Sequence, residues 1–355
     1  MRIASARLIP YRLPFVCPWQ SRQGRETIRT GWLIRLETDG GLGGLGDVAP
    51  LAAAGTEPSE QSLAWLGPHM RHIQGQEIRT ALEALSDDAP PAARCGLETA
   101  LLDLLTRQRE ISISRALNPE AVTHIEVNAA LGPLARITQG TLDAATEEGY
   151  SVIKLKAGIR PWQEELAMLR KIAMRLNDGV RLRLDANRAW SPSEAAAFFG
   201  GLEELPIEAV EEPLAMNDPG LLEQMQRDHP FAIAIDESLP EHGPDRLFDH
   251  PPCRRLVLKP AREGGLRRTV ELAHNARAAG MEVVVTTLLE SAVGCHAAAQ
   301  VALAVDDARH PLAHGLDTGR WLQHDVAEPL TPSGGRIATP PGPGLGVALT
   351  EESAA

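Results

Sequence analysis

Three acidic residues in the second half of the chain end short apolar runs at nearly even spacing. They are Asp185 in RLRLDAN, Glu211 in AVEEP and Asp236 in AIAIDES, 26 and 25 residues apart. Lysines flank the set, at Lys154 and Lys156 in VIKLK before it and at Lys259 in LVLKP after it. Carboxylate oxygens are the ligands that a divalent cation such as Mg2+ prefers, and a lysine amine can transfer protons. The pattern therefore predicts a metal site with basic groups on both sides.

The spacing of these residues matches one strand plus one helix of a (β/α)8 barrel. We expect strands near 125–129, 152–156, 181–185, 207–211, 232–236, 255–259, 282–286 and 312–316. Helical stretches lie between them, for example at 162–176 and 265–279. Eight such units in series favour a closed parallel barrel over an open sheet. The strand ends, and the polar residues on them, would then converge on the barrel mouth.

The chain is longer than a barrel alone requires. Its 355 residues exceed the roughly 250 of a bare (β/α)8 barrel. The fold class predicted is α/β, a modified (β/α)8 TIM barrel with an N-terminal α+β capping domain. We place the capping domain at 1–120, the catalytic barrel at 121–320, and a C-terminal segment at 321–355 that returns to the capping domain. Segments 20–25 and 51–55 are candidates for loops that close over the mouth.

Composition narrows the class of partner and the compartment. A net charge of -12 argues against nucleic acid or an anionic membrane as partner. The four cysteines are far apart with no CxxC pair, and the N-terminus lacks the apolar core of a signal peptide, so we expect a cytoplasmic protein. The sequence leaves open whether it is a monomer or a homo-oligomer. The GLGGLG run at 41–46 matches a dinucleotide fingerprint but does not open a helix, so we predict no nucleotide there.

The lysine pair has a defined geometry if VIKLK is a strand. Lys154 and Lys156 are two residues apart, so both would point into the barrel. Burial and mutual repulsion disfavour their charge, so we expect the pKa of at least one to fall, which would make it a general base near neutral pH. The alternative is an edge strand with solvated lysines. Each acidic motif could likewise be a helix cap by itself, but all of them occurring in this order favours a metal site, with Glu212 and Glu237 as supporting partners.

With these motifs the chain resembles the enolase superfamily, in its muconate-lactonizing-enzyme subgroup. Within it, RLDANRAWSP, AIDESL, LVLKP, LESAVG and GLDT are most similar to the o-succinylbenzoate synthase family. The resemblance implies Mg2+ held by Asp185, Glu211 and Asp236, and acid/base catalysis by Lys156 and Lys259. It implies substrate contacts from Lys154, Arg183, Asn187, Thr286 and Thr287, with Arg183 also orienting Lys156.

The resemblance implies a dehydratase of menaquinone biosynthesis that converts a hydroxylated succinyl-cyclohexadiene carboxylate to 2-succinylbenzoate. An N-succinylamino acid racemase or a related epimerase of the same subgroup stays open as an alternative. Dipeptide epimerases commonly carry Asp-x-Asp at strand eight, where this chain has Gly315 and Asp317. A non-catalytic barrel that only binds a carboxylate is the alternative from a different class.

Overall fold

The capping domain begins with a long antiparallel sheet. The computed structural model describes residues 1–21 and 24–354. Strands β1 (Ile3–Ser21), β2 (Gly24–Thr38) and β3 (Gly43–Val48) pair in the order β1-β2-β3, and a hairpin joins β2 to β3. The candidate closing loop at 20–25 includes residues 22 and 23, which lie outside the described residues.

Helices cover this sheet and explain the glycine run. They are η1 (Ala52–Ala54), α1 (Ser59–His72), α2 (Ile78–Glu83), α3 (Pro91–Gln108) and α4 (Ile113–Leu117). The GLGGLG run leads into β3, which packs against α3. A methyl group on Gly46 would lie 1.9 Å from the carbonyl oxygen of Gly96. The glycines therefore permit close packing of a strand on a helix, a role that needs no nucleotide.

A curled parallel sheet of seven strands forms the second unit. Its order is β5-β6-β7-β8-β9-β10-β11. The strands are β5 (Ala129–Pro133), β6 (Val152–Lys156), β7 (Arg181–Asp185), β8 (Ile207–Glu211), β9 (Ala232–Ile235), β10 (Arg255–Leu258) and β11 (Glu282–Val285). Three of them coincide with the predicted bounds, because each alternates or runs apolar up to a polar end.

The first and eighth predicted strands differ from the prediction. The 125–129 strand is displaced: β4 (His124–Glu126) pairs with β12 (Arg336–Ala338), and β5 starts at Ala129. The 312–316 segment makes two single parallel bridges, Val127 to His314 and Thr286 to Gly315. Because these bridges reach both ends of the sheet, the segment links β5 to β11 and closes the ring.

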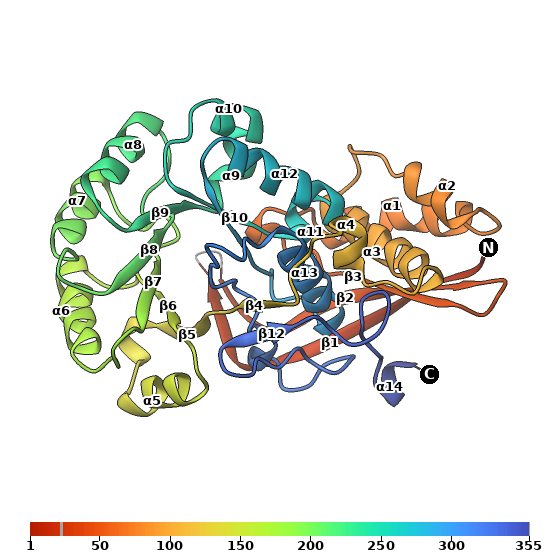
Figure 1. Ribbon diagram of the computed structural model, residues 1–355, viewed down its shortest axis with the longest axis horizontal. Coiled ribbons are helices and arrows are strands. Elements are labelled where there is room, and N and C mark those ends of the chain that lie inside the picture. The colour runs from red at the N-terminus through yellow and green to blue at the C-terminus, as the bar shows by residue number, and fades with distance from the viewer. Residues whose placement is uncertain (22–23, 355) are drawn as a thin grey trace.

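Outer helices and the C-terminal segment complete the chain (Figure 1). Between and after the strands lie η2 (Leu134–Arg136), α5 (Gln139–Glu147), α6 (Trp162–Ala173), α7 (Pro192–Gly200), α8 (Pro219–Asp228), α9 (Ser238–His242), α10 (Pro244–Asp249), α11 (Pro260–Glu263), α12 (Leu266–Ala278), α13 (Ala292–Val305), η3 (Gly319–Trp321) and α14 (Glu351–Ala354). The backbone of Gln323 donates to Pro14 of β1, and that of Leu345 donates to Asp103 of α3. Within the described ranges, no helix has the length and apolarity needed to span a lipid bilayer.

Candidate active site

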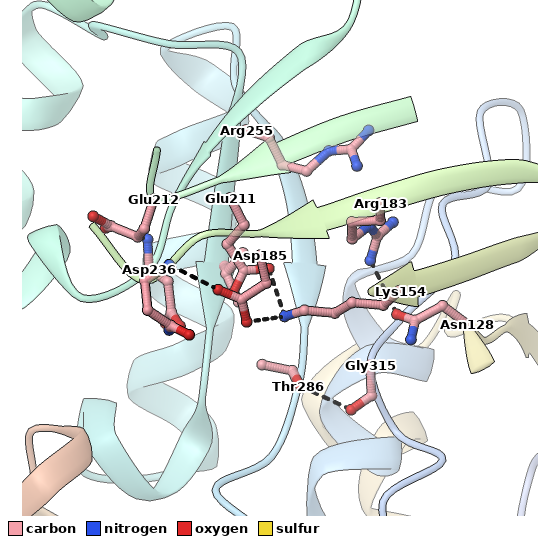
Figure 2. Close-up of polar contacts among 12 residues, drawn as sticks. Asn128, Lys154, Arg183, Asp185, Glu211, Glu212, Asp236, Arg255, Thr286 and Gly315 are labelled. Carbon is pink, nitrogen blue, oxygen red and sulfur yellow. Dashed lines mark hydrogen bonds and ion pairs between the residues drawn. The ribbon is translucent and has the colours of Figure 1, made fainter. Parts of the chain in front are cut away.

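The polar strand ends of β6 to β10 meet at one mouth of the barrel, as Figure 2 shows for Lys154, Asp185 and Glu211. Lys154 on β6 pairs in register with Arg183 on β7, and Asp185 pairs with Glu211 on β8. The intervening residues Leu155, Leu184 and Val210 are fully buried. The apolar side chains on one face of these strands therefore pack in the hydrophobic core, whereas the polar side chains on the other face line the barrel interior.

Lys154 bridges two of the predicted metal ligands. Its Nζ lies 3.0 Å from Asp185 Oδ2 and donates a 2.7 Å hydrogen bond to Glu211 Oε2. Burial alone would lower the pKa of Lys154, but the carboxylates of Asp185 and Glu211 outweigh it and raise that pKa well above the ordinary value. The expectation that repulsion lowers a lysine pKa is therefore wrong for Lys154, because its nearest charges are negative. Paired in this way with Asp185 and Glu211, Lys154 is favoured in its cationic form, which does not favour it as the general base.

Asp236 is held by two cations. Its Oδ2 accepts a 2.6 Å hydrogen bond from Lys259, and its Oδ1 accepts a 2.5 Å bond from Arg262 in α11. Burial opposes its charge, yet Lys259 and Arg262 hold the pKa of Asp236 far below the usual range. Arg262 was missed from the sequence. The signal was available, because Lys259 and Arg262 are three residues apart across the first turn of a helix.

The carboxylates fit a divalent cation in number and chemistry. Within the described residues no three metal-binding side chains already surround a common point, because each carboxylate is turned to a lysine or arginine. Glu211 Oε1 is nevertheless buried and accepts no hydrogen bond from the described residues. Burial raises the pKa of Glu211 to about 8, and Asp185 and Asp236 add to the effect against the pull of Lys154. A crowded set of carboxylate oxygens, with one buried oxygen of Glu211 free of hydrogen bonds from the described residues, suits Mg2+, which Asp185, Glu211 and Asp236 would hold.

Lys156 and Lys259 lie on opposite sides of the carboxylates. Lys156 ends β6 and Lys259 follows β10, with β7, β8 and β9 between them in the sheet. The Lys156 ammonium lies 6.0 Å from the ring centre of Trp19, which belongs to β1 of the capping domain. Trp19 in turn packs edge-to-face on Trp321 of η3 at 5.6 Å. The capping domain and the C-terminal segment therefore both reach the Lys156 side of the mouth.

Residues next to the predicted ligands hold the strand ends in place. Glu212 has a left-handed backbone (φ 44°), and its buried carboxylate accepts from the backbone N–H of Asp236 and of Ser238. Asn187, also left-handed (φ 43°), donates through its side chain to Glu237 at 2.6 Å. Strained backbone of this kind clusters at functional sites. Asn187 thus contacts the supporting carboxylate, and its predicted substrate contact stays a prediction.

Arg183 lies in a different layer from the mouth. It donates to both carboxylate oxygens of Glu208, at 3.0 and 3.2 Å, and to Asn128 and the carbonyl of Ala313. Glu208 also pairs with Arg255, which in turn pairs with Glu282. These contacts favour a structural role for Arg183 in the barrel interior, and its expected contacts with substrate and with Lys156 stay predictions. The sequence could not reveal this because Glu208 sits at a register shift between β7 and β8.

The two threonines of strand seven are engaged with strand eight. Thr286 donates to the carbonyl of Gly315 at 2.8 Å, and the hydroxyl of Thr287 lies 2.9 Å from that of Thr318. A methyl group on Gly315 would lie 2.5 Å from Thr286 Oγ1. Their predicted contact with substrate is untested, but the close approach explains why residue 315 has no side chain.

A second residue absent from the sequence prediction supports the loop after Lys156. Glu165 of α6 is buried, and its carboxylate accepts from the backbone N–H of Gly158, Ile159 and Arg160 at 2.6 to 3.0 Å. This loop leaves β6 directly after the lysine pair. Glu165 therefore fixes the backbone that carries Lys156 out of the strand.

Comparison with known proteins agrees with this geometry. Residues 139–353 match the family described as enolase C-terminal domain-like. The o-succinylbenzoate synthase of Desulfotalea psychrophila is 26% identical over 358 residues, covering 92% of this chain and 96% of that protein. The L-Ala-D/L-Glu epimerase of Francisella tularensis subsp. novicida is 24% identical, covering 83% of this chain and 84% of that protein.

A solved structure has the same fold over the whole chain. The muconate lactonizing enzyme of Pseudomonas fluorescens, complexed with muconolactone, superposes with a TM-score of 0.88 at 26% identity, covering 99% of this chain and 98% of that one. Relatives with different reactions are thus about equally similar, and what they share is the barrel and its cap. The chain belongs to the enolase superfamily, in its muconate-lactonizing-enzyme subgroup.

Proposed function

We propose that this enzyme is an Mg2+-dependent o-succinylbenzoate synthase, which dehydrates a 2-succinyl-6-hydroxy-cyclohexadiene-1-carboxylate to 2-succinylbenzoate in menaquinone biosynthesis. The observation that carries the proposal is the arrangement at the mouth. A buried set of three carboxylates, with Glu211 Oε1 unpartnered among the described residues, lies between two lysines of opposed strands. The similarity to a curated o-succinylbenzoate synthase supports the choice of substrate.

The residues of the mouth divide the chemistry between them. Mg2+ bound by Asp185, Glu211 and Asp236 would supply positive charge for the substrate carboxylate as its α-proton leaves. In the proposed reaction the Lys156 amine takes that α-proton. The electron pair of the broken C–H bond forms a ring double bond as the hydroxyl departs. Lys156 returns its proton to the departing oxygen, so the sum is loss of one water and an aromatic ring.

Two further cations act by charge alone. Lys259, fixed by Asp236 at 2.6 Å, would stabilise the anionic ring from the opposite face. Lys154, cationic between Asp185 and Glu211, would neutralise the side of the mouth that receives the carboxylate. Neither needs to transfer a proton in a dehydration on one face.

A dipeptide substrate is disfavoured by strand eight. Asp317 accepts from the hydroxyl of Tyr150 at 2.8 Å and pairs with Arg320 at 2.6 Å, so its charge is already compensated. Gly315 lies too close to Thr286 for a side chain. The position that commonly carries the first acid of the Asp-x-Asp pair therefore cannot hold a substrate ammonium here.

The test is turnover of the cyclohexadiene substrate with Mg2+, followed by ultraviolet absorbance. We expect turnover by the wild type and a loss of about 10^4-fold in Lys156→Ala, since positioned acid/base groups contribute up to that factor. Lys171→Ala is the matched control, because Lys171 is exposed on α6 outside the barrel. Absence of wild-type turnover, with exchange of the α-hydrogen of N-succinylamino acids in D2O, would replace the synthase by a racemase.

A further inference from the structure

Arg29 of β2 is a buried arginine whose contacts connect the capping domain to the barrel. Only 3% of its surface is exposed. Its guanidinium donates to the carbonyl oxygens of Ala49, of Pro50 at 2.9 Å and of Leu289 at 3.1 Å, and more weakly to its neighbour Thr30 at 3.3 Å. Within the described chain no carboxylate accepts a hydrogen bond from it; the charges of Asp47 and Glu290 act on it from nearby. The arginine thus serves backbone carbonyls from two separate segments.

The first segment leads into a short turn at the barrel mouth. Ala49 and Pro50 precede Leu51, whose N–H donates to Thr56 Oγ1 at 2.6 Å and so closes the turn at 51–56. At its far end, a methyl group on Gly55 would lie 3.2 Å from the Arg262 side chain. Arg262 is the residue that binds Asp236. Arg29 therefore holds the start of the turn. The end of the turn lies against Arg262, which binds the predicted metal ligand Asp236.

The second segment is the loop after β11, which carries the strand-seven threonines. Leu289 has a left-handed backbone (φ 62°), which is strained for a leucine, and its N–H donates to Thr287 Oγ1 at 3.3 Å. A second capping-domain residue holds the same loop, because Asp47 accepts from the N–H and the hydroxyl of Ser291. The strain persists because contacts from the capping domain fix the loop on both sides of Glu290.

We propose that Arg29 is a positioning residue that locks the 51–56 turn to the loop after β11 and thereby sets the wall of the substrate cavity beside Arg262. It touches neither the reacting atoms nor the predicted metal ligands, so it acts through the turn. A guanidinium presents several N–H donors in a fixed plane, which suits three carbonyls in different directions, whereas the donors of a lysine ammonium all lie on one nitrogen. Replacement by lysine therefore weakens the lock, and replacement by methionine removes it.

The test compares Arg29→Lys and Arg29→Met with the control Arg7→Met, because Arg7 is an exposed arginine of the same sheet whose ion pair in the described chain is with Glu37. Hydrogen–deuterium exchange is read at the amides of Leu51, Ala54 and Leu289. We expect exchange at these amides to speed up about tenfold in Arg29→Met and less in Arg29→Lys, with α12 unchanged, because local opening is set by local contacts. Arg7→Met should match the wild type.

A kinetic measurement accompanies the exchange, and it alone rests on the proposed function. KM should rise about tenfold in Arg29→Met with kcat within about twofold, since a displaced cavity wall weakens ground-state and transition-state binding alike. Unchanged exchange at the three amides, or equal acceleration through the whole barrel, would overturn the proposal; so would a loss of kcat at constant KM. If the wild type does not turn over the cyclohexadiene, the exchange data still decide the role of Arg29, and Arg29→Lys decides it if Arg29→Met does not fold.

Discussion

Two glutamates on the same strand, three residues apart, have opposite electrostatic surroundings. Burial would raise the pKa of Glu208, but Arg183 and Arg255 outweigh it and lower that pKa to about 2. Burial raises the pKa of Glu211 to about 8, and Lys154 offsets only part of it. Glu208 belongs to a network of ion pairs in the barrel interior, whereas Glu211 keeps one buried oxygen, Oε1, without a hydrogen bond from the described residues. The difference fits an inner layer that stabilises the fold and a mouth that would hold the proposed Mg2+.

The choice of basic residue follows the same division. The sequence has 35 lysines and arginines, of which only four are lysines. Three of the four are Lys154, Lys156 and Lys259 at the mouth, and the ion pairs of the inner layer use arginine alone. An arginine cannot lose its proton in a protein, whereas a lysine can. The residues proposed to transfer protons are therefore lysines, whereas arginines hold the inner layer together and, through Arg262, also support Asp236 at the mouth.

The largest effect should come from removing the charge of Glu211. In Glu211→Gln we expect kcat/KM to fall by at least about 10^3-fold, because a neutral amide binds Mg2+ weakly and the developing negative charge loses its support. Stabilisation of the protein against heat by added Mg2+ should be lost in the same variant. Steady-state kinetics and thermal melts with and without Mg2+ measure both. A variant that keeps its activity would remove Glu211 from the metal site.

The matched change in the inner layer should affect stability and spare activity. Glu208→Gln leaves Arg183 without its charged partner, and breaking a buried ion pair costs about 3 kcal/mol of unfolding free energy. Activity per folded molecule should stay within about threefold of the wild type. Urea unfolding and active-site-normalised kinetics make the comparison. A loss of activity without a loss of stability would show that the two layers are not separate in function.

The free energy of unfolding at acidic pH should depend on the ionisation of Glu208. Its folded-state pKa of about 2 lies below the ordinary value near 4.3. Its contribution of about 3 kcal/mol is therefore complete above about pH 4.3 and is lost as the pH falls toward 2. The difference in unfolding free energy between wild type and Glu208→Gln should shrink over this range. A difference that is constant or grows toward acid pH contradicts the assignment of the ion pairs.

The smallest effect is expected at the loop after Lys156. Glu165→Gln leaves one carbonyl oxygen where a carboxylate accepts from three N–H groups. We expect kcat/KM to fall about tenfold, since a modest displacement of a catalytic side chain is costly. Glu164→Gln is the control, because Glu164 is on the same helix turn, is exposed, and within the described chain pairs with Arg160. Equal kinetics for the two variants would show that the loop does not position Lys156.

Prediction from sequence succeeded where the signal was local. Val152–Lys156, Arg181–Asp185 and Ile207–Glu211 have the predicted bounds, because a polar residue ends each apolar run. It failed at β4, because this segment pairs with β12, which lies more than two hundred residues away in the sequence. Arg183 was placed correctly on its strand, but its ion pair with Glu208 was not predicted. A neighbouring bulge turns Glu208 toward it, and no sequence pattern reports a bulge reliably.

The sequence by itself determined which strands carry the acids and lysines, and in what order, because strand periodicity and spacing are properties of the chain. Only the tertiary structure decided which of these charges compensate one another. Arg262 meets Asp236, Glu165 meets the loop after Lys156, and Arg29 meets Leu289. The last pair is 260 residues apart. Such contacts depend on how the capping domain and the strand ends pack in space, and the energy of a buried charge is set by its neighbours there.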